Sequence, residues 1–314
     1  MNIIERAGKK LGLNAGKSLV EKAAERFEAA DVAAEIAARA PSPGPTASPR
    51  PAVRAPSPAV AVGAGVGARR ETRRQATIDF ERLRREGFAL PVDQTALAEE
   101  LRLIKRPLLS AAFAQGGSGV ENSNLIMVTS ANPKEGKTFI ATNLALSMAS
   151  EHDVHVLLID ADVANPSIPS QLGFDAEVGL IDAVSDATID LADVMIRTNI
   201  DNLIVLPAGR PRPGASELLA SARMTRFVND IAKRYADRVI LFDSPPVLAR
   251  SEAMVLAQHV GQVVFVVEAE RTSRTAMSEA LGMIGGNKLG GVVLNKTPQI
   301  PLQEGFGYYD YRNR

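Results

Sequence analysis

The feature that most constrains this chain is a short apolar run, residues 124–130, that leads into a loop ending in Gly136, Lys137 and Thr138. A helix-forming run follows at once. Strand, loop and helix in this order build an anion site, because the loop N–H groups and the helix N-terminus point at one place. Lys137 is expected to reach the terminal phosphates of a nucleotide, and the Thr138 hydroxyl to bind Mg²⁺. The nucleotide-binding residues expected here are Asn132, Pro133, Lys134, Glu135, Gly136, Lys137, Thr138 and Phe139.

Apolar runs and helix-forming segments alternate from residue 124 onward. The predicted strands are residues 124–130, 154–160, 203–207, 238–243, 262–267 and 291–295, and the predicted helices between them are residues 137–150, 216–235, 250–258 and 273–286. Another helix is expected from Leu97 to Leu109, with Pro107 marking its end. Continuous apolar runs are typical of parallel strands covered on both faces. The pattern predicts an α/β fold with a doubly wound, mostly parallel sheet of the P-loop NTPase type, which binds ligands at the carboxyl ends of its strands.

Two of these strands end in carboxylates. Asp160 closes one run and Asp162 follows it, while Asp243 closes another. Mg²⁺ binds carboxylates, a loop hydroxyl, phosphate oxygens and water. Asp243 is therefore expected to hold Mg²⁺ through water, and Asp160 and Asp162 to bind the metal or to accept a proton from an attacking hydroxyl. The alternative is that these aspartates only cap the helices or turns that follow them.

The composition of the chain excludes several kinds of site. The 36 basic and 36 acidic residues balance, so net charge does not indicate a nucleic-acid partner. The absence of cysteine excludes disulfides, cysteine-bound zinc and iron–sulfur clusters, and it fits a reducing cytoplasm. His152, His155 and His259 are too scattered to predict a metal site. No apolar run is long enough for a membrane span, and the N-terminus lacks the apolar core of a signal peptide.

Changes in composition predict four parts. Residues 1–40 are expected to form an amphipathic helical arm, residues 41–75 a flexible Pro- and Ala-rich linker, residues 76–304 the folded domain, and residues 305–314 a tyrosine-rich tail. The basic start of the arm has two interpretations, contact with an anionic membrane surface or a partner, and a weakly ordered helix without a special role. The seven arginines between residues 69 and 85 alternate with acidic residues, which favours a solvated, partly helical face.

The loop and the two carboxylate-ended strands together resemble the motifs of the bacterial tyrosine kinases. The Walker A, Walker A′ and Walker B motifs of that family are similar to residues 131–138, 157–162 and 242–246, and its segments between the second and third motifs to residues 207–211 and 216–219. The basic arm, residues 105–109 and residues 160–164 look most like the exosortase-associated tyrosine autokinases of exopolysaccharide systems. The resemblance extends from about Ala96 to the C-terminus.

This resemblance implies a reaction. ATP·Mg²⁺ would bind the three motifs, and its γ-phosphoryl group would move to C-terminal tyrosines, for which Tyr308, Tyr309 and Tyr311 are the candidates. The alternative for this tail is that its aromatic rings dock on the domain. Asn295 resembles the position that contacts adenine in the family, although it could simply end a strand in a turn.

The resemblance also implies partners. Members of the family form rings in which the tail of one subunit enters the site of the next, through a Glu-x-x-Arg-x-x-Arg helix. Glu99, Arg102 and Lys105 match that pattern, with Lys in place of the last Arg, and lysine lacks the bidentate fork of arginine. A membrane-bound activator of polysaccharide chain length or export is the other expected partner. The chain is then expected to be cytoplasmic and peripheral at the inner face of the plasma membrane.

Three functions stay open on the sequence. The first is a protein-tyrosine autokinase, the second is an ATPase switch of the MinD/ParA type, and the third is a nucleotide-bound adaptor of a polysaccharide exporter. The ATPase switches look alike through all three motifs but carry a second lysine where this chain has Asn132. Asn132 and the tyrosine tail therefore favour the autokinase. Two further departures from the family are Lys134 in place of a usual glycine, and Asn165 in place of a frequent basic residue.

Overall fold

The structure is a computed structural model of the chain, and the residues it describes are 74–90, 93, 95–114, 120–285 and 288–298. These residues fall within one unit of the chain, which begins at Glu71. The predicted arm, most of the predicted linker and the predicted tail lie outside the described residues.

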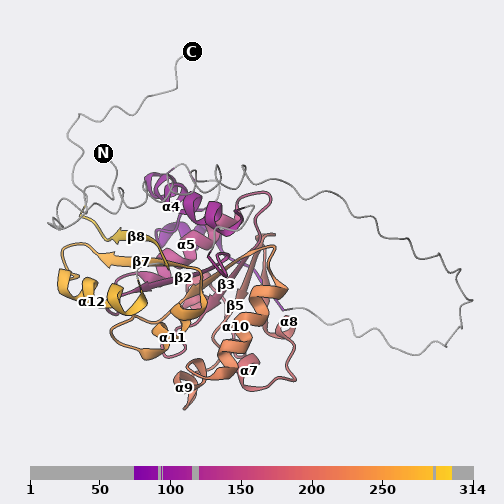
Figure 1. The fold of residues 1–314 in the computed structure, drawn as a ribbon. Helices are drawn as coiled ribbons and strands as arrows, with labels where there is room; N and C mark the ends of the chain where they lie inside the picture. Colours follow the sequence, from indigo (N-terminus) through magenta and orange to yellow (C-terminus); the bar gives the residue numbers. More distant parts are fainter. Residues whose placement is uncertain (1–73, 91–92, 94, 115–119, 286–287, 299–314) are drawn as a thin grey trace, which may run out of the picture. The chain divides into compact units, whose positions relative to one another are not determined.

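The described strands form one eight-stranded sheet in the order β1-β4-β5-β3-β6-β2-β7-β8 (Figure 1). All neighbouring strands are parallel except the antiparallel pair β4 and β5. The mostly parallel sheet predicted from the apolar runs is therefore confirmed. The strands are β1 (Gln75–Ala76), β2 (Leu125–Ser130), β3 (Val156–Asp160), β4 (Ile196–Thr198), β5 (Leu203–Leu206), β6 (Val239–Asp243), β7 (Gln262–Glu268) and β8 (Leu289–Asn295).

Helices cover both faces of this sheet, as the doubly wound prediction requires (Figure 1). One face carries α3 (Phe80–Arg85), α4 (Ala96–Ala112), α5 (Lys137–Ala149) and α6 (Ile168–Leu172). The other face carries α7 (Leu180–Ser185), α8 (Leu191–Val194), α9 (Ala215–Leu219), α10 (Ala222–Arg234), α11 (Ser251–His259) and α12 (Arg274–Ile284). None of the described helices is long and apolar enough to cross a membrane.

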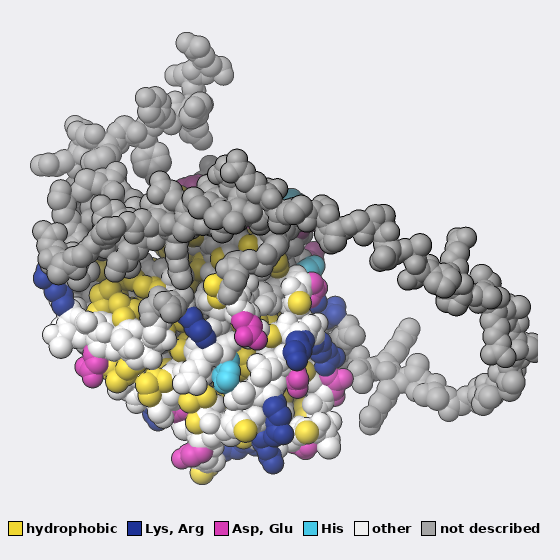
Figure 2. All heavy atoms as spheres, in the orientation of Figure 1, with side chains coloured by type: hydrophobic (Ala, Val, Ile, Leu, Met, Phe, Trp, Pro, Cys, Tyr) yellow, Lys and Arg dark blue, Asp and Glu magenta, His cyan; other side chains and the backbone are white. Residues whose placement is uncertain are grey.

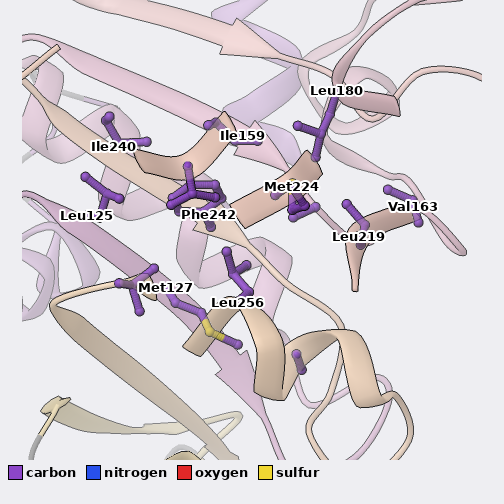
Figure 3. Packing of buried hydrophobic residues seen from close by; sticks show 14 of the residues in the cluster. Leu125, Met127, Ile159, Val163, Leu180, Leu219, Met224, Ile240, Phe242 and Leu256 are labelled. Carbon is purple, nitrogen blue, oxygen red and sulfur yellow. The ribbon is translucent and has the colours of Figure 1, made fainter. Parts of the chain in front are cut away.

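The two-sided cover explains why the central strands are apolar throughout. Along β2, Leu125 and Met127 belong to the core beneath α10 and α11, whereas Ile126 and Val128 belong to the core beneath α5. Figure 3 shows part of the first of these cores, in which Leu125, Met127 and Phe242 of the sheet belong to one cluster with Met224 of α10 and Leu256 of α11. Successive residues of a strand point to opposite faces, so burial on both faces selects an unbroken apolar run.

The structure corrects two of the predicted helix boundaries. Pro107 lies inside α4 and does not end it. Leu101 and Leu108 are both buried, one on each side of Pro107, so packing of the apolar face offsets the hydrogen bond that proline cannot make. The predicted helix 216–235 is two helices, because α9 ends at Leu219 and Ser221 begins α10 as its N-cap, accepting a hydrogen bond from the Arg223 backbone N–H (3.2 Å).

Candidate active site

The phosphate loop joins β2 to α5 and is held in an unusual backbone conformation. Gly136, the N-cap of α5, has φ 95°, in the left-handed region that favours glycine. Lys134 has φ 68°, which explains why glycine is usual there and indicates that lysine is strained at this position. Ala131, which replaces the first glycine of the loop, stays outside the positive-φ region, as its Cβ requires.

Lys137 and the carboxylates converge at the carboxyl edge of the sheet. The Nζ atom of Lys137 lies 2.7 Å from Oδ2 of Asp162 and 3.4 Å from Oγ1 of Thr138. Asp160 and Asp243 are paired across the neighbouring strands β3 and β6. The structure thus brings together every residue for which the sequence predicted a catalytic role, and it does so because parallel strands end at the same edge.

Burial controls the protonation of this cluster. Burial, reinforced by the charge of Asp243, raises the pKa of Asp160 to about 8. Burial likewise raises the pKa of Asp243 to about 6, although the positive charge of Lys137 opposes the rise. Burial lowers the pKa of Lys137, but the charges of Asp243 and Asp162 outweigh this, so the net shift is upward and the ammonium form is favoured.

The carboxylates fit a hard cation. Both carboxylate oxygens of Asp243, and Oδ1 of Asp160, are buried without a hydrogen-bond partner among the described residues. Unpaired buried carboxylate oxygens are costly, and oxygen donors beside the Thr138 hydroxyl form the donor set that Mg²⁺ takes. Among the described residues, no three His, Asp or Glu side chains form a group that could hold a metal alone. Phosphate oxygens and water would therefore have to complete the coordination shell.

Asp160 caps the helix that follows it, as the alternative interpretation of the sequence proposed, but it does so with only one of its two carboxylate oxygens. Its Oδ2 atom accepts hydrogen bonds from the backbone N–H groups of Ser167 (2.9 Å) and Ile168 (3.1 Å) at the start of α6. The Ser167 hydroxyl in turn lies 3.4 Å from Oγ1 of Thr138. Ser167 was not predicted as a site residue, because it lies seven positions beyond Asp160 in a segment without a recognisable motif. Asp160 thus fixes the start of α6 with one oxygen and keeps the other free.

Asn295 lies against the phosphate loop, as its predicted place in the nucleotide site implies. Its side-chain amide donates a hydrogen bond to the backbone carbonyl of Glu135 (2.9 Å). The next residue, Lys296, donates to the carbonyl of Lys134 (2.7 Å). The end of β8 therefore supports the loop backbone, and the contact of Asn295 with adenine stays a prediction.

The helix predicted to contact a neighbouring subunit differs from expectation at Lys105. Glu99 and Arg102 form an ion pair on the surface of α4. Lys105 is buried, and its ammonium group donates to the Ser147 carbonyl (2.7 Å) and pairs with Glu151 (2.6 Å). The lysine is thus engaged inside the subunit, and its role in a ring contact stays a prediction.

The chain is similar to several known proteins. The ParA family model, described as NUBPL iron-transfer P-loop NTPase, matches residues 121–295. The putative tyrosine-protein kinase CapB of Staphylococcus aureus is 30% identical over 220 residues, which cover 69% of this chain and 91% of CapB. The chain belongs to the bacterial tyrosine kinase family. Its P-loop fold is a nucleotide-binding fold.

Other relatives and solved structures place this bacterial tyrosine kinase in the same group. The tyrosine-protein kinase CpsD of Streptococcus agalactiae is 30% identical, with 63% of this chain and 86% of CpsD covered. The tyrosine-protein kinase wzc of Salmonella typhimurium is also 30% identical, but the chain matches only 26% of its length. The solved structure of the chimerical protein CapA2B2 has 27% sequence identity and a TM-score of 0.58, and the match covers 72% of this chain and 95% of CapA2B2. The kinase domain of the Escherichia coli tyrosine kinase ETK has 25% identity and a TM-score of 0.57, and the match covers 78% of this chain and 100% of that domain.

Proposed function

We propose that this bacterial tyrosine kinase transfers the γ-phosphoryl group of ATP to tyrosines of its own C-terminal tail, and that this autophosphorylation regulates exopolysaccharide synthesis or export. One observation carries the proposal. Lys137, Thr138, Asp162 and Asp243, from three separate elements, converge where buried carboxylate oxygens have no partner among the described residues. Such a cluster is costly for an unliganded chain, and it suits a bound nucleotide with its metal.

Each residue of this cluster would have a distinct role in binding ATP or in phosphoryl transfer. Lys137 would leave Asp162 on ATP binding and bind the terminal phosphates with its ammonium group. Thr138, Asp162 and Asp243 would hold Mg²⁺, which supplies positive charge that stabilises the transferring phosphoryl group. Asp160 or Asp162 would accept the proton of the tyrosine hydroxyl as its oxygen attacks phosphorus and the bond to ADP breaks.

The acceptor tyrosines remain a proposal, because Tyr308, Tyr309 and Tyr311 lie outside the described residues. The remaining tyrosine of the chain, Tyr235, is a poorer candidate acceptor, because its ring is packed against the folded domain. Its ring contacts the guanidinium groups of Arg238 (4.9 Å) and Arg234 (5.5 Å) and packs against the core. Phosphorylation of the tail would add several negative charges to it and alter what it binds.

Further proposals on partners follow from the family resemblance of the sequence. ATP, other copies of this chain in a ring, and a membrane-bound polysaccharide activator would be its partners. The kinase would act in the cytoplasm, peripheral at the inner face of the plasma membrane through that activator. Since Lys105 is used inside the subunit, any ring would rely on Glu99 and Arg102 among the three predicted residues.

A second candidate is an ATPase switch, which the ParA family match favours. Asn132, at the position of the second lysine of such switches, donates its side-chain amide to Glu135 within its own loop (3.0 Å). The amide thus fills this place within the loop and supplies no second ammonium group, which supports the kinase over a switch. ATP turnover without protein phosphorylation would favour the switch instead.

Phosphosite mass spectrometry on the full chain, after incubation with ATP and Mg²⁺, tests the proposal. We expect phosphate on Tyr308, Tyr309 or Tyr311 in the wild type and none in Lys137→Ala. Lys233→Ala, which removes an exposed lysine of α10, is the matched control and should label normally. Label in Lys137→Ala, or label that persists at Tyr235 when the three tail tyrosines are phenylalanine, would contradict the assignment.

A further inference from the structure

Glu135 is a carboxylate buried inside a loop that is proposed to bind phosphates. Its side chain is 3% exposed. One carboxylate oxygen accepts a hydrogen bond from the Asn132 backbone N–H (3.0 Å), and the other accepts from the Asn132 side-chain amide (3.0 Å). The Glu135 carboxylate therefore holds the backbone and side chain of Asn132, and this contact fixes the turn formed by residues 132–135.

A third hydrogen bond to Glu135 comes from a distant segment. The Thr272 hydroxyl donates to Oε1 of Glu135 at 2.6 Å, across a sequence separation of 137 residues. The same hydroxyl accepts a hydrogen bond from the backbone N–H of Glu268, the last residue of β7 (3.0 Å). The Thr272 hydroxyl thus acts as donor and as acceptor, and it links the end of the buried strand β7 to the phosphate loop.

From this chain of hydrogen bonds we propose that Thr272 is a positioning residue for nucleotide binding, because its hydroxyl fixes Glu135 and so the backbone N–H groups of the phosphate loop. The inference rests on the proposed function in that the loop must bind ATP. Thr272 itself is held by β7 and by its backbone N–H bond to the Glu268 carbonyl (3.1 Å), so the anchor is rigid. A hydrogen bond to a charged group is among the stronger ones, especially away from water.

The link to Glu135 separates this role from catalysis. The hydrogen bonds of Thr272 go to Glu135 and Glu268. The Lys137 ammonium group pairs with Asp162, and Asp243 ends β6, so Thr272 does not hold these catalytic residues directly. Loss of the Thr272 hydroxyl should therefore loosen the loop around the phosphates and weaken ATP binding. It should leave the turnover at saturating ATP nearly unchanged, which a defect in the catalytic carboxylates would not.

The test is calorimetric titration of the full chain with ATP·Mg²⁺, together with kcat and KM for ATP. Thr272→Val, which keeps the shape and removes the hydroxyl, should raise Kd and KM for ATP about tenfold. Thr272→Ser, which keeps the hydroxyl, should bind ATP within about threefold of the wild type. Thr225→Val is the matched control, since it removes a threonine hydroxyl that contacts His259 (3.1 Å) away from the loop.

A second pair of variants tests whether Thr272 acts through Glu135. In a Glu135→Ala background, Thr272→Val should not weaken ATP binding further, because the partner of the hydroxyl is already gone. A full additional tenfold loss there, or wild-type affinity in Thr272→Val alone, would overturn the inference while leaving the proposed function intact. Failure of the wild type to bind ATP would overturn both.

Discussion

Replacing Gly136 by alanine tests how the phosphate loop is built. Gly136 has φ 95°, and a Cβ atom there would lie 2.0 Å from Nδ2 of Asn295. Alanine therefore meets two obstacles, the left-handed backbone and the Asn295 side chain. Gly214, the N-cap of α9, provides the matched control, because it has φ 80° but nothing lies within 4 Å of its virtual Cβ.

The size of each effect can be estimated separately. The left-handed backbone alone costs an alanine about 1–2 kcal/mol of the free energy of unfolding, and this is the whole cost expected for Gly214→Ala. Gly136→Ala also displaces the Asn295 amide from the Glu135 carbonyl, to which it donates at 2.9 Å. With about 1 kcal/mol for that hydrogen bond, the expected cost is about 2–3 kcal/mol.

Urea denaturation followed by circular dichroism would measure these costs in the full chain. In an Asn295→Ala background the steric obstacle is gone, so Gly136→Ala should then cost no more than Gly214→Ala does. The two single changes should therefore be non-additive. Equal losses for Gly136→Ala and Gly214→Ala in the native background, or strict additivity with Asn295→Ala, would refute the reasoning.

Three further predictions follow. Because the pKa of Asp160 is raised to about 8 and that of Asp243 to about 6, ATP·Mg²⁺ binding should tighten and release protons as pH rises through this interval. The ligand-free chain should lose stability as pH rises from the ordinary carboxyl pKa of 3.8 to about 8, because the folded state still holds protons there that the unfolded chain has released. Calorimetry in two buffers measures the binding effect and urea titrations measure the stability effect; constant affinity would contradict the first. Lys105→Met should lower the free energy of unfolding by about 1–3 kcal/mol, because it removes the donor to the Ser147 carbonyl, and an unchanged urea midpoint would exclude this role. Lys134→Gly should raise that free energy by up to about 1 kcal/mol by relieving the backbone strain at φ 68°, whereas a loss of stability would show that no strain is stored there.

Much of the candidate site followed from local pattern. The loop before α5 and the carboxylates that end β3 and β6 were each recognisable within a few residues of sequence. Parallel strands end at one edge of a sheet, so the sequence alone predicts that four side chains lie close together: Lys137, Asp160, Asp162 and Asp243. Only the structure shows that Lys137 pairs with Asp162. Only the structure shows that one oxygen of Asp160 accepts hydrogen bonds from the start of α6 while the other has no hydrogen-bond partner among the described residues.

Short elements and helix boundaries were less predictable. The antiparallel strand β4 has three residues, and β1 has two, so neither carries a readable period. Pro107 has a strong local preference to end a helix, but burial of Leu101 and Leu108 overrides it. Ser221 carried a usable signal, because a serine within a helical pattern is a good N-cap.

The sequence by itself determined the α/β class, the phosphate loop and the identity of the carboxylates, because each depends on neighbours in the chain. The tertiary structure decided which faces meet. The spacing of Glu99, Arg102 and Lys105 puts them on one side of a helix, yet only the packing of α4 on α5 turns Lys105 inward. The hydrogen bond from Thr272 to Glu135 likewise joins segments 137 residues apart, and helical or strand periodicity describes one element at a time.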